Sequence, residues 1–418
     1  MSGRAAAGAP HYDALETRDP ETRERQQFAA LRDRIAAAKR SAPGWQRILA
    51  DVDPDRVTDR ASLARLPVTR KSDLVELQRA LLPFGGLTAT DVGHLRRVFV
   101  SPGPIYDPEG ARPDYWRFAR ALYAAGFRAG DLVHNSFSYH LTPGGAMLED
   151  GALALGCAVV PGGVGQTELQ LKAIEDLKPS GYTGTPSFLK ILVDKARETG
   201  ADISSLGKAM VSGEALPPSL RAEIERDGIS VAQSYASADL GLIAYESSAR
   251  AGLIVDEGAI LEIVRPGTGD PVAEGEVGEV VVSVLNPDYP LIRFATGDLS
   301  AYLEGPSPCG RTGPRIKGWM GRADQTAKLR GMFVRPAQIA EVAKRHPEIL
   351  RARLVIESRD HQDRATLLCE TAVADAALAR AIGESFQAVA KLRAEVALVA
   401  PGAIARDGKV IEDARKYD

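Results

Sequence analysis

Short stretches rich in β-branched residues alternate with amphipathic stretches through the middle of this 418-residue chain. The expected strands are 95–100, 132–136, 158–160, 181–183 and 208–211, and the expected helices are 115–126, 147–155, 168–177, 187–199 and 219–227. The connections between them are only a few residues long. Strand–helix alternation with short connections is typical of βαβ units, whose strands are parallel. The sequence therefore predicts an α/β fold built on parallel sheets.

The pattern changes beyond about residue 250. Segments 260–264 and 278–283 are strand-like and are separated by Gly and Pro turns, which predicts a small β-barrel-like subdomain over about 250–318. A passage rich in glycine and charge follows, and beyond it two helical and three strand-like segments predict a compact α/β unit. We therefore expect an N-terminal domain over 1–322 and a small mobile C-terminal lid domain over 323–418.

Charge and cysteine content narrow the function classes. The chain has 52 Lys and Arg residues and 55 Asp and Glu residues, which gives a net charge of −3 and argues against a nucleic-acid partner. Its three cysteines lie far apart without zinc-ligand spacing, so we expect no structural zinc. No stretch is apolar and long enough to span a bilayer, and the first ten residues have no apolar signal core. These features favour a cytoplasmic protein with no membrane partner. They do not exclude that the protein forms a homodimer.

Four glycine-containing passages follow expected strands. They are Tyr-Thr-Gly-Thr-Pro-Ser at 182–187, Val-Ser-Gly-Glu-Ala at 211–215, Gln-Ser-Tyr-Ala-Ser-Ala-Asp-Leu-Gly at 233–241, and Pro-Leu-Ile-Arg-Phe-Ala-Thr-Gly-Asp-Leu at 290–299, the last followed by Gly-Arg-Ala-Asp at 321–324. In an open parallel sheet, nucleotides bind beyond the carboxyl ends of the strands. One such loop is weak evidence because tight turns need glycine anyway, but the ordered set is a strong signal.

In this order and spacing the passages resemble the adenylate-forming superfamily, most closely its phenylacetate–CoA ligase branch. Residues 66–71 resemble the branch's LPxTxK passage, 139–145 its YGLFTGG stretch and 308–311 its CGR loop. The resemblance covers roughly residues 60 to 418. It implies two half-reactions, in which a carboxylate attacks the α-phosphorus of ATP to give acyl-AMP and pyrophosphate, and the thiol of coenzyme A then displaces AMP.

The resemblance also implies nucleotide contacts. Asp298 would accept hydrogen bonds from both ribose hydroxyls, because one carboxylate can accept two donors. The alternative is a purely structural role, in which Asp298 lies in a turn and binds its own backbone. The other nucleotide-binding positions implied are Gly213, Glu214, Ala215, Ser234, Tyr235, Ala236, Ser101, Gly103 and Arg322. The backbone contributes most of the adenine contacts at 213–215 and 234–236, so side-chain identity matters less there.

The implied catalytic residues are Lys409, Asp239 and Arg322. Lys409 would bridge the acid carboxylate and the α-phosphate, where its ammonium suits the charge that develops on the phosphoryl oxygens. Asp239 stands where the family has a Glu that holds Mg²⁺, and it can bind that ion through oxygen. Asp324 would be the hinge whose torsions absorb the rotation of the lid domain.

The acid should lie in a pocket of aromatic and small residues. The positions expected to line it are Phe137, Tyr139, Gly144, Gly145, Thr185 and Tyr235. This mixture suits a flat, compact acid, such as an aryl or other small carboxylic acid. An aromatic side chain beside glycines is equally often ordinary core.

The phosphate loop departs from the family pattern. In place of Ser-Ser-Gly-Thr-Thr-Gly-Lys-Pro, residues 101–108 read Ser-Pro-Gly-Pro-Ile-Tyr-Asp-Pro. Pro102 and Pro104 have no N–H to donate to a phosphate, and Asp107 is expected to add a negative charge there. Beside the leading prediction of an ATP-dependent acid–CoA ligase, two alternatives therefore stay open: an adenylating enzyme with a different acceptor, and a catalytically degenerate protein that binds AMP or acyl-AMP.

Overall fold

The chain divides into two compact units. The computed structural model describes residues 9–323, 325–330, 332–359, 362–373, 375–405 and 409–415. Unit 1 comprises Met1–Trp319 and unit 2 comprises Met320–Asp418, so the division falls three residues before the expected boundary at 322. Within the described residues, no helix combines the length and apolarity needed to cross a membrane.

A nine-stranded sheet forms the larger part of unit 1. In spatial order its strands are β14 (Tyr302–Leu303), β15 (Arg315–Ile316), β10 (Leu253–Val255), β9 (Gly241–Glu246), β8 (Ser230–Ser237), β7 (Lys208–Val211), β6 (Gly181–Gly184), β4 (Leu132–Asn135) and β5 (Ala158–Pro161). The run from β5 to β8 is parallel, and the run from β8 to β14 is antiparallel. This arrangement confirms the predicted α/β fold with a parallel sheet.

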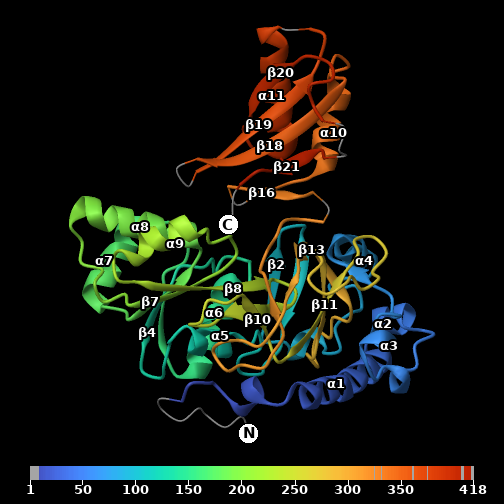
Figure 1. Ribbon diagram of the computed structural model, residues 1–418, viewed down its shortest axis with the longest axis vertical. Helices are drawn as coiled ribbons and strands as arrows, with labels where there is room; N and C mark the ends of the chain where they lie inside the picture. Colours follow the sequence, from blue (N-terminus) through green and yellow to red (C-terminus); the bar gives the residue numbers. More distant parts are fainter. Residues whose placement is uncertain are drawn as a thin grey trace. The chain divides into compact units, whose positions relative to one another are not determined.

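The parallel strands are joined by helices, as their spacing predicts. The helices are α6 (Gly144–Leu155), α7 (Thr167–Leu177), α8 (Pro186–Thr199) and α9 (Pro218–Glu225). In α8, the hydroxyl of Thr185 accepts a hydrogen bond from the N–H of Phe188 at 3.3 Å, Pro186 occupies the first turn, and Gly200 ends the helix in a left-handed conformation. Figure 1 shows α7, α8 and α9 gathered beside β7, and their apolar faces share one core with β6 and β7.

The helix expected over 115–126 is shorter than predicted. It is α5 (Phe118–Ala124), because Arg117 has a left-handed backbone with a φ of 67°. The side chain of Arg117 donates to the carboxylate of Asp256 at 2.8 Å and to the carbonyl oxygens of Leu240 and Leu242. These long-range contacts stabilise a backbone conformation that the local helical pattern does not favour.

The strands over 250–318 do not form one separate barrel-like subdomain, contrary to expectation. β11 (Ala259–Val264), β12 (Gly278–Val284) and β13 (Phe294–Ser300) form a four-stranded sheet with β1 (Thr69–Arg70), in the order β1-β13-β12-β11. β10, β14 and β15 extend the nine-stranded sheet instead. The guanidinium of the buried Arg293 binds Glu262 on β11 and the carbonyl oxygens of Ala64 and Leu66. It thereby ties the segment before β1 to the four-stranded sheet.

The N-terminal helices pack on this second sheet. They are α1 (Pro20–Ser41), α2 (Pro43–Ile48), α3 (Arg60–Leu63) and α4 (Leu74–Ala80). Phe28, Leu31 and Ile35 of α1 lie in one apolar core with residues of β11 and β12, and Figure 1 shows α1 to α3 on that side of the unit. A separate hairpin of β2 (Arg97–Ser101) and β3 (Ile105–Glu109) carries the predicted phosphate loop.

Unit 2 is the compact α/β unit that the sequence predicts. Its sheet has the order β20-β19-β18-β21, with α10 (Pro336–Arg345) and α11 (Ala376–Ala390). The strands are β18 (Arg351–Arg359), β19 (Gln362–Glu370), β20 (Glu395–Val399) and β21 (Ile411–Asp413), and a hairpin of β16 (Ala327–Leu329) and β17 (Met332–Val334) precedes them. Ile382 and Phe386 of α11 pack against this sheet in a core of its own.

Candidate active site

Asp298 is held within β13 by side chains from two other segments. Its Oδ2 accepts a hydrogen bond from the hydroxyl of Tyr235 at 2.8 Å, and its Oδ1 accepts one from the indole N–H of Trp319 at 3.1 Å. The hydroxyl of Thr296 accepts a hydrogen bond from the Asp298 N–H at 3.1 Å and contacts the Tyr235 hydroxyl at 3.2 Å. The carboxylate is therefore oriented by tertiary contacts within a strand, which argues against a turn residue that binds only its own backbone.

The two predicted adenine loops lie next to each other. β7 ends at Val211, which pairs with Gln233 of β8, so the loop after β7 starts beside Ser234, Tyr235 and Ala236. The hydroxyl of Ser212 donates to the carbonyl oxygen of Ser234 at 2.8 Å and links the two segments. Gly213 has a φ of 78°, a conformation that favours glycine, and Glu214 beside it is exposed. Parallel pairing thus brings residues 213–215 and 234–236 together.

A buried charge cluster lies beside this edge of the sheet. The ammonium of Lys71 forms an ion pair with Oδ2 of Asp239, whose side chain is fully buried. Burial opposes the positive charge of Lys71, but the carboxylates of Asp239, Asp107 and Asp298 act against that effect and raise the pKa of Lys71. Lys71 belongs to the 66–71 passage, yet sequence reasoning did not predict it as a site residue.

Asp107 corrects one expectation. Its side chain is 0% exposed, and neither carboxylate oxygen has a hydrogen-bond partner among the described residues. Burial and the nearby negative charge of Asp239 raise its pKa to about 8. At neutral pH Asp107 is therefore mostly protonated, and it does not add the full negative charge expected beside the phosphates.

The predicted phosphate loop is a tight hairpin turn. Ser101 pairs with Ile105 across the hairpin, and its buried hydroxyl donates to the Ile105 carbonyl oxygen at 3.4 Å. A Cβ atom on Gly103 would lie 2.8 Å from the side chain of Ile105, so glycine is required there. Pro102 and Pro104 flank it without an N–H. Gly103 is exposed at the tip, whereas the Ser101 side chain faces the hairpin's own backbone.

Four predicted pocket residues lie together after β4. Asn135 donates from Nδ2 to the hydroxyl of Tyr139 at 2.7 Å and to the carbonyl oxygen of Gly145 at 2.8 Å. A Cβ on Gly145 would lie 2.8 Å from the Tyr139 ring, and one on Gly144 would lie 3.4 Å from Phe137. Both rings therefore pack on glycine backbone. Asn135 is fully buried, and as a polar residue at the end of a strand it was detectable in the sequence but was not predicted.

Phe137 connects this pocket to the adenine loops, since a Cβ on Gly213 would lie 3.8 Å from its ring. Thr185 caps α8 at the end of β6, the strand between β4 and β7. Tyr235 reaches Asp298 from β8. The order of the nine-stranded sheet thus places the predicted acid pocket and Tyr235 on neighbouring strands towards their carboxyl ends, where a ligand can bind, and Tyr235 links this edge to Asp298 on β13 of the four-stranded sheet.

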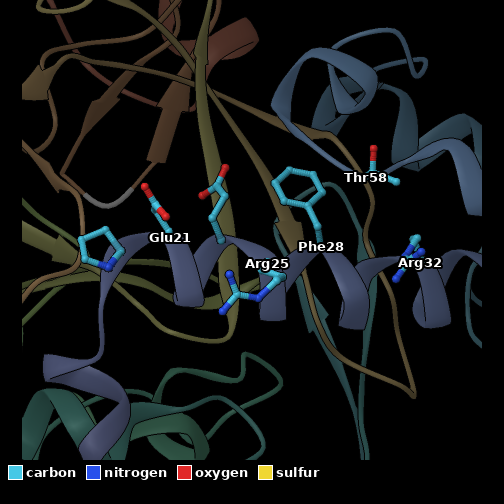
Figure 2. A pocket seen from close by; sticks show the side chains of 7 residues that line it. Glu21, Arg25, Phe28, Arg32 and Thr58 are labelled. Atoms are coloured by element: carbon cyan, nitrogen blue, oxygen red, sulfur yellow. The ribbon is translucent and has the colours of Figure 1, made fainter.

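A surface pocket of about 620 Å³ lies elsewhere, on α1. Pro20, Glu21, Glu24, Arg25, Phe28, Arg32 and Thr58 line it (Figure 2). None of the predicted site residues is among them, and its rim is mainly charged side chains. This pocket is therefore separate from the predicted nucleotide site.

Two predicted catalytic residues belong to unit 2. Lys409 is exposed, and its Nζ lies 3.9 Å from Oε1 of Glu412. Arg322 is half-buried near the start of the unit. The predicted hinge Asp324 lies outside the described residues.

Comparisons with known proteins identify the family of the chain. Residues 138–284 match the family of AMP-binding enzymes. The chain is 32% identical to a phenylacetate-coenzyme A ligase of Thermus thermophilus, over 84% of this chain and 83% of that protein. It is 31% identical to the phenylacetate-coenzyme A ligase of Escherichia coli, over 79% of this chain and 78% of that protein.

The fold is also that of a solved ligase. A crystal structure of 2-hydroxyisobutyryl-CoA ligase, in complex with 2-HIB-AMP and CoA in its thioesterification state, matches with a TM-score of 0.83 and 25% identity. The match covers 99% of this chain and 94% of that one. These findings confirm the resemblance seen in the motifs. The chain belongs to the phenylacetate–CoA ligase branch of the AMP-binding enzymes.

Proposed function

We propose that this protein is an ATP-dependent acid–CoA ligase that activates an aryl or other small carboxylic acid as its acyl-adenylate. One observation carries the assignment to these residues: Asp298, fixed by Tyr235 and Trp319, stands beside the predicted adenine segment 234–236. There its carboxylate can accept both ribose hydroxyls of AMP. The relatives are named as ligases of phenylacetate, and the matching structure holds an adenylate together with CoA.

In the first half-reaction an oxygen of the acid attacks the α-phosphorus of ATP. A new P–O bond forms, the bond from the α-phosphorus to the bridging oxygen breaks, and pyrophosphate leaves. Lys409 supplies an ammonium for the charge that develops on the phosphoryl oxygens, and Arg322 contacts ribose or phosphate. Lys71 offers a second ammonium from unit 1, because its ion pair with Asp239 holds it beside Asp298.

Asp239 is the residue proposed to hold magnesium. Its Oδ1 is buried and has no hydrogen-bond partner among the described residues, while its Oδ2 binds Lys71. An oxygen of this kind fits Mg²⁺, which proteins commonly bind through one or two carboxylates together with substrate phosphates. When bound, the ion would neutralise phosphate charge.

In the second half-reaction the thiol of CoA attacks the acyl carbon, the thioester bond forms, and AMP leaves. Between the two half-reactions, unit 2 would rotate about the predicted hinge Asp324. Phe137 and Tyr139 both pack on glycine backbone, and a flat acid would bind against these two rings. The use of ATP and CoA, with three free thiols, favours a cytoplasmic location.

One observation favours a second candidate, an AMP- or acyl-AMP-binding protein without ATP turnover. The hairpin turn at 102–104 holds two prolines in place of phosphate-binding N–H donors. An adenylating enzyme with an acceptor other than CoA is also compatible with the first half-reaction.

Pyrophosphate release separates these candidates. The protein is mixed with ATP, Mg²⁺ and a panel of aryl and short hydroxy acids, with and without CoA. We expect release with at least one acid and conversion of the adenylate to an acyl-CoA. Pyrophosphate without acyl-CoA would indicate another acceptor. AMP binding without pyrophosphate from any acid would favour the degenerate binding protein.

A further inference from the structure

Cys309 lies in a polar environment that the proposed ligase reaction does not use. It is half-buried in the loop between β14 and β15. Its sulfur is 3.1 Å from the hydroxyl of Ser307 and accepts a hydrogen bond from Nη1 of Arg311 at 3.5 Å. Polar neighbours that can donate to the sulfur favour the thiolate over the thiol.

Arg311 is anchored so that its guanidinium stays on the sulfur. Its Nε donates to Oε1 of the buried Glu16 at 2.6 Å, and the same oxygen accepts a hydrogen bond from Tyr245 at 2.6 Å. The Arg311 side chain is only 4% exposed. Its Nη2 is buried and has no hydrogen-bond partner among the described residues. A spare N–H donor therefore lies on the group that contacts the thiol.

The other two cysteines have the opposite surroundings. Cys157 donates its S–H to the carbonyl oxygen of Arg128 at 3.2 Å, and Cys369 is fully buried in the apolar core of unit 2. Burial raises the pKa of each to about 11. For Cys309 burial acts in the same direction, but the hydrogen bonds from Ser247, Ser307 and Arg311 outweigh it and lower the pKa to about 7.

We propose that Cys309 is a peroxide-reactive thiolate and a site of reversible oxidation to sulfenic acid. The thiolate sulfur attacks the terminal oxygen of a hydroperoxide. An S–O bond forms, the O–O bond breaks, and the leaving alkoxide or hydroxide takes a proton from water. The sulfur is oxidised by two electrons and the peroxide is reduced to an alcohol or water. The guanidinium of Arg311, whose Nη1 contacts the sulfur, would donate to the transferred oxygen, and a low-molecular-weight thiol can return the sulfenic acid to thiol.

The first test measures thiol reactivity on the full chain against pH. Iodoacetamide labelling, read by peptide mass spectrometry, follows all three cysteines in one sample, so Cys157 and Cys369 are internal controls. We expect Cys309 to react at pH 7 at least about tenfold faster than either, because only thiolates react and its thiolate fraction is far larger. Labelling of Cys309 with a midpoint at or above its ordinary value of 9 would overturn the proposal.

The second test uses hydrogen peroxide followed by dimedone, which traps sulfenic acids. We expect the label on Cys309 and its loss in Cys309→Ser, while pyrophosphate release by that variant stays at the wild-type rate. Ser307→Ala and Ser247→Ala each remove one donor and should slow iodoacetamide labelling at pH 7 at least about twofold, with wild-type rates at pH 10. Arg311→Lys should slow sulfenic acid formation more than it slows labelling by iodoacetamide, which transfers no oxygen.

The two serine variants keep the test valid if Arg311→Lys does not fold. Dimedone on Cys157 or Cys369 instead of Cys309, or unchanged labelling in both serine variants, would refute the assignment. Because labelling does not depend on ATP or the acid, its failure is distinguishable from failure of the proposed ligase activity.

Discussion

The buried acid Asp107 provides a quantitative test of the charge cluster. Its carboxyl has a pKa of about 8 in the folded chain, against an ordinary value of 3.8, because burial and Asp239 disfavour its charge. Between pH 3.8 and about pH 8, Asp107 keeps its proton in the folded state and releases it in the unfolded state. Stability must therefore fall as the pH rises from about 4 to about 8. Asp107→Asn replaces the acid with an uncharged amide of similar shape and removes this dependence.

The magnitude follows from linkage. Each pH unit inside the window changes the free energy of unfolding by about 1.4 kcal/mol for one proton. Between pH 5 and pH 8 the variant should therefore gain about 4 kcal/mol over the wild type. Any constant cost of burying the amide cancels, because only the change between the two pH values is compared. At roughly 2 °C per kcal/mol for a large domain, the difference in Tm grows by several degrees.

The assay is differential scanning calorimetry of both proteins in EDTA, at intervals from pH 5 to pH 8. Asp176→Asn is the control, because Asp176 is exposed and pairs with Lys172, and surface ion pairs contribute little to stability. It should follow the wild type at each pH. The reasoning is refuted if the Tm difference between Asp107→Asn and wild type is constant, or shrinks, as the pH rises.

Three further predictions concern the proposed site. Asp298→Ala removes the acceptor proposed for both ribose hydroxyls. Because a hydrogen bond to a charged group contributes about 1.5–3 kcal/mol, KM for ATP should rise about a hundredfold in pyrophosphate-release assays. A rise below threefold would contradict the ribose role. Lys409→Ala should slow pyrophosphate release far more than the conversion of supplied acyl-AMP to acyl-CoA, and equal loss of both would refute its assigned role. Gly145→Ala places a methyl 2.8 Å from the Tyr139 ring and should lower kcat/KM for the acid at least about tenfold with little change in KM for ATP.

The parallel half of the fold was predictable because each βα unit carries local signals. The segment from Gly184 to Gly200 illustrates this: a strand end, a Thr cap, a Pro in the first turn, an apolar stripe and a C-terminal glycine all occur in order. The division of residues 250–318 between two sheets was not predictable in this way. The four-stranded sheet includes contacts between distant segments, such as those of Arg293 with the carbonyl oxygens of Ala64 and Leu66, and no local pattern encodes such partners.

The site was predictable where the motif itself makes the contact. The adenine loops come together because β7 and β8 are paired, and the hydroxyl of Tyr235 on β8 joins them to Asp298 on β13. Lys71 and Asp107 were not predicted in their roles because their properties arise from tertiary burial. A sequence shows that Asp107 is an acid, but only the surrounding fold determines which protonation state it prefers.

These two residues also bear on the choice between the proposed ligase and a degenerate binding protein. The prolines of the hairpin remove backbone donors that could bind pyrophosphate oxygens. A fixed negative charge at Asp107 would weaken phosphate binding further, but its raised pKa keeps the carboxyl mostly neutral at pH 7. Lys71, which pairs with Asp239 and is also influenced by the charge of Asp298, then supplies a positive charge to the cluster. Phosphate charge in this chain would therefore be balanced by side chains and a cation rather than by glycine N–H groups, an arrangement that is compatible with ATP turnover.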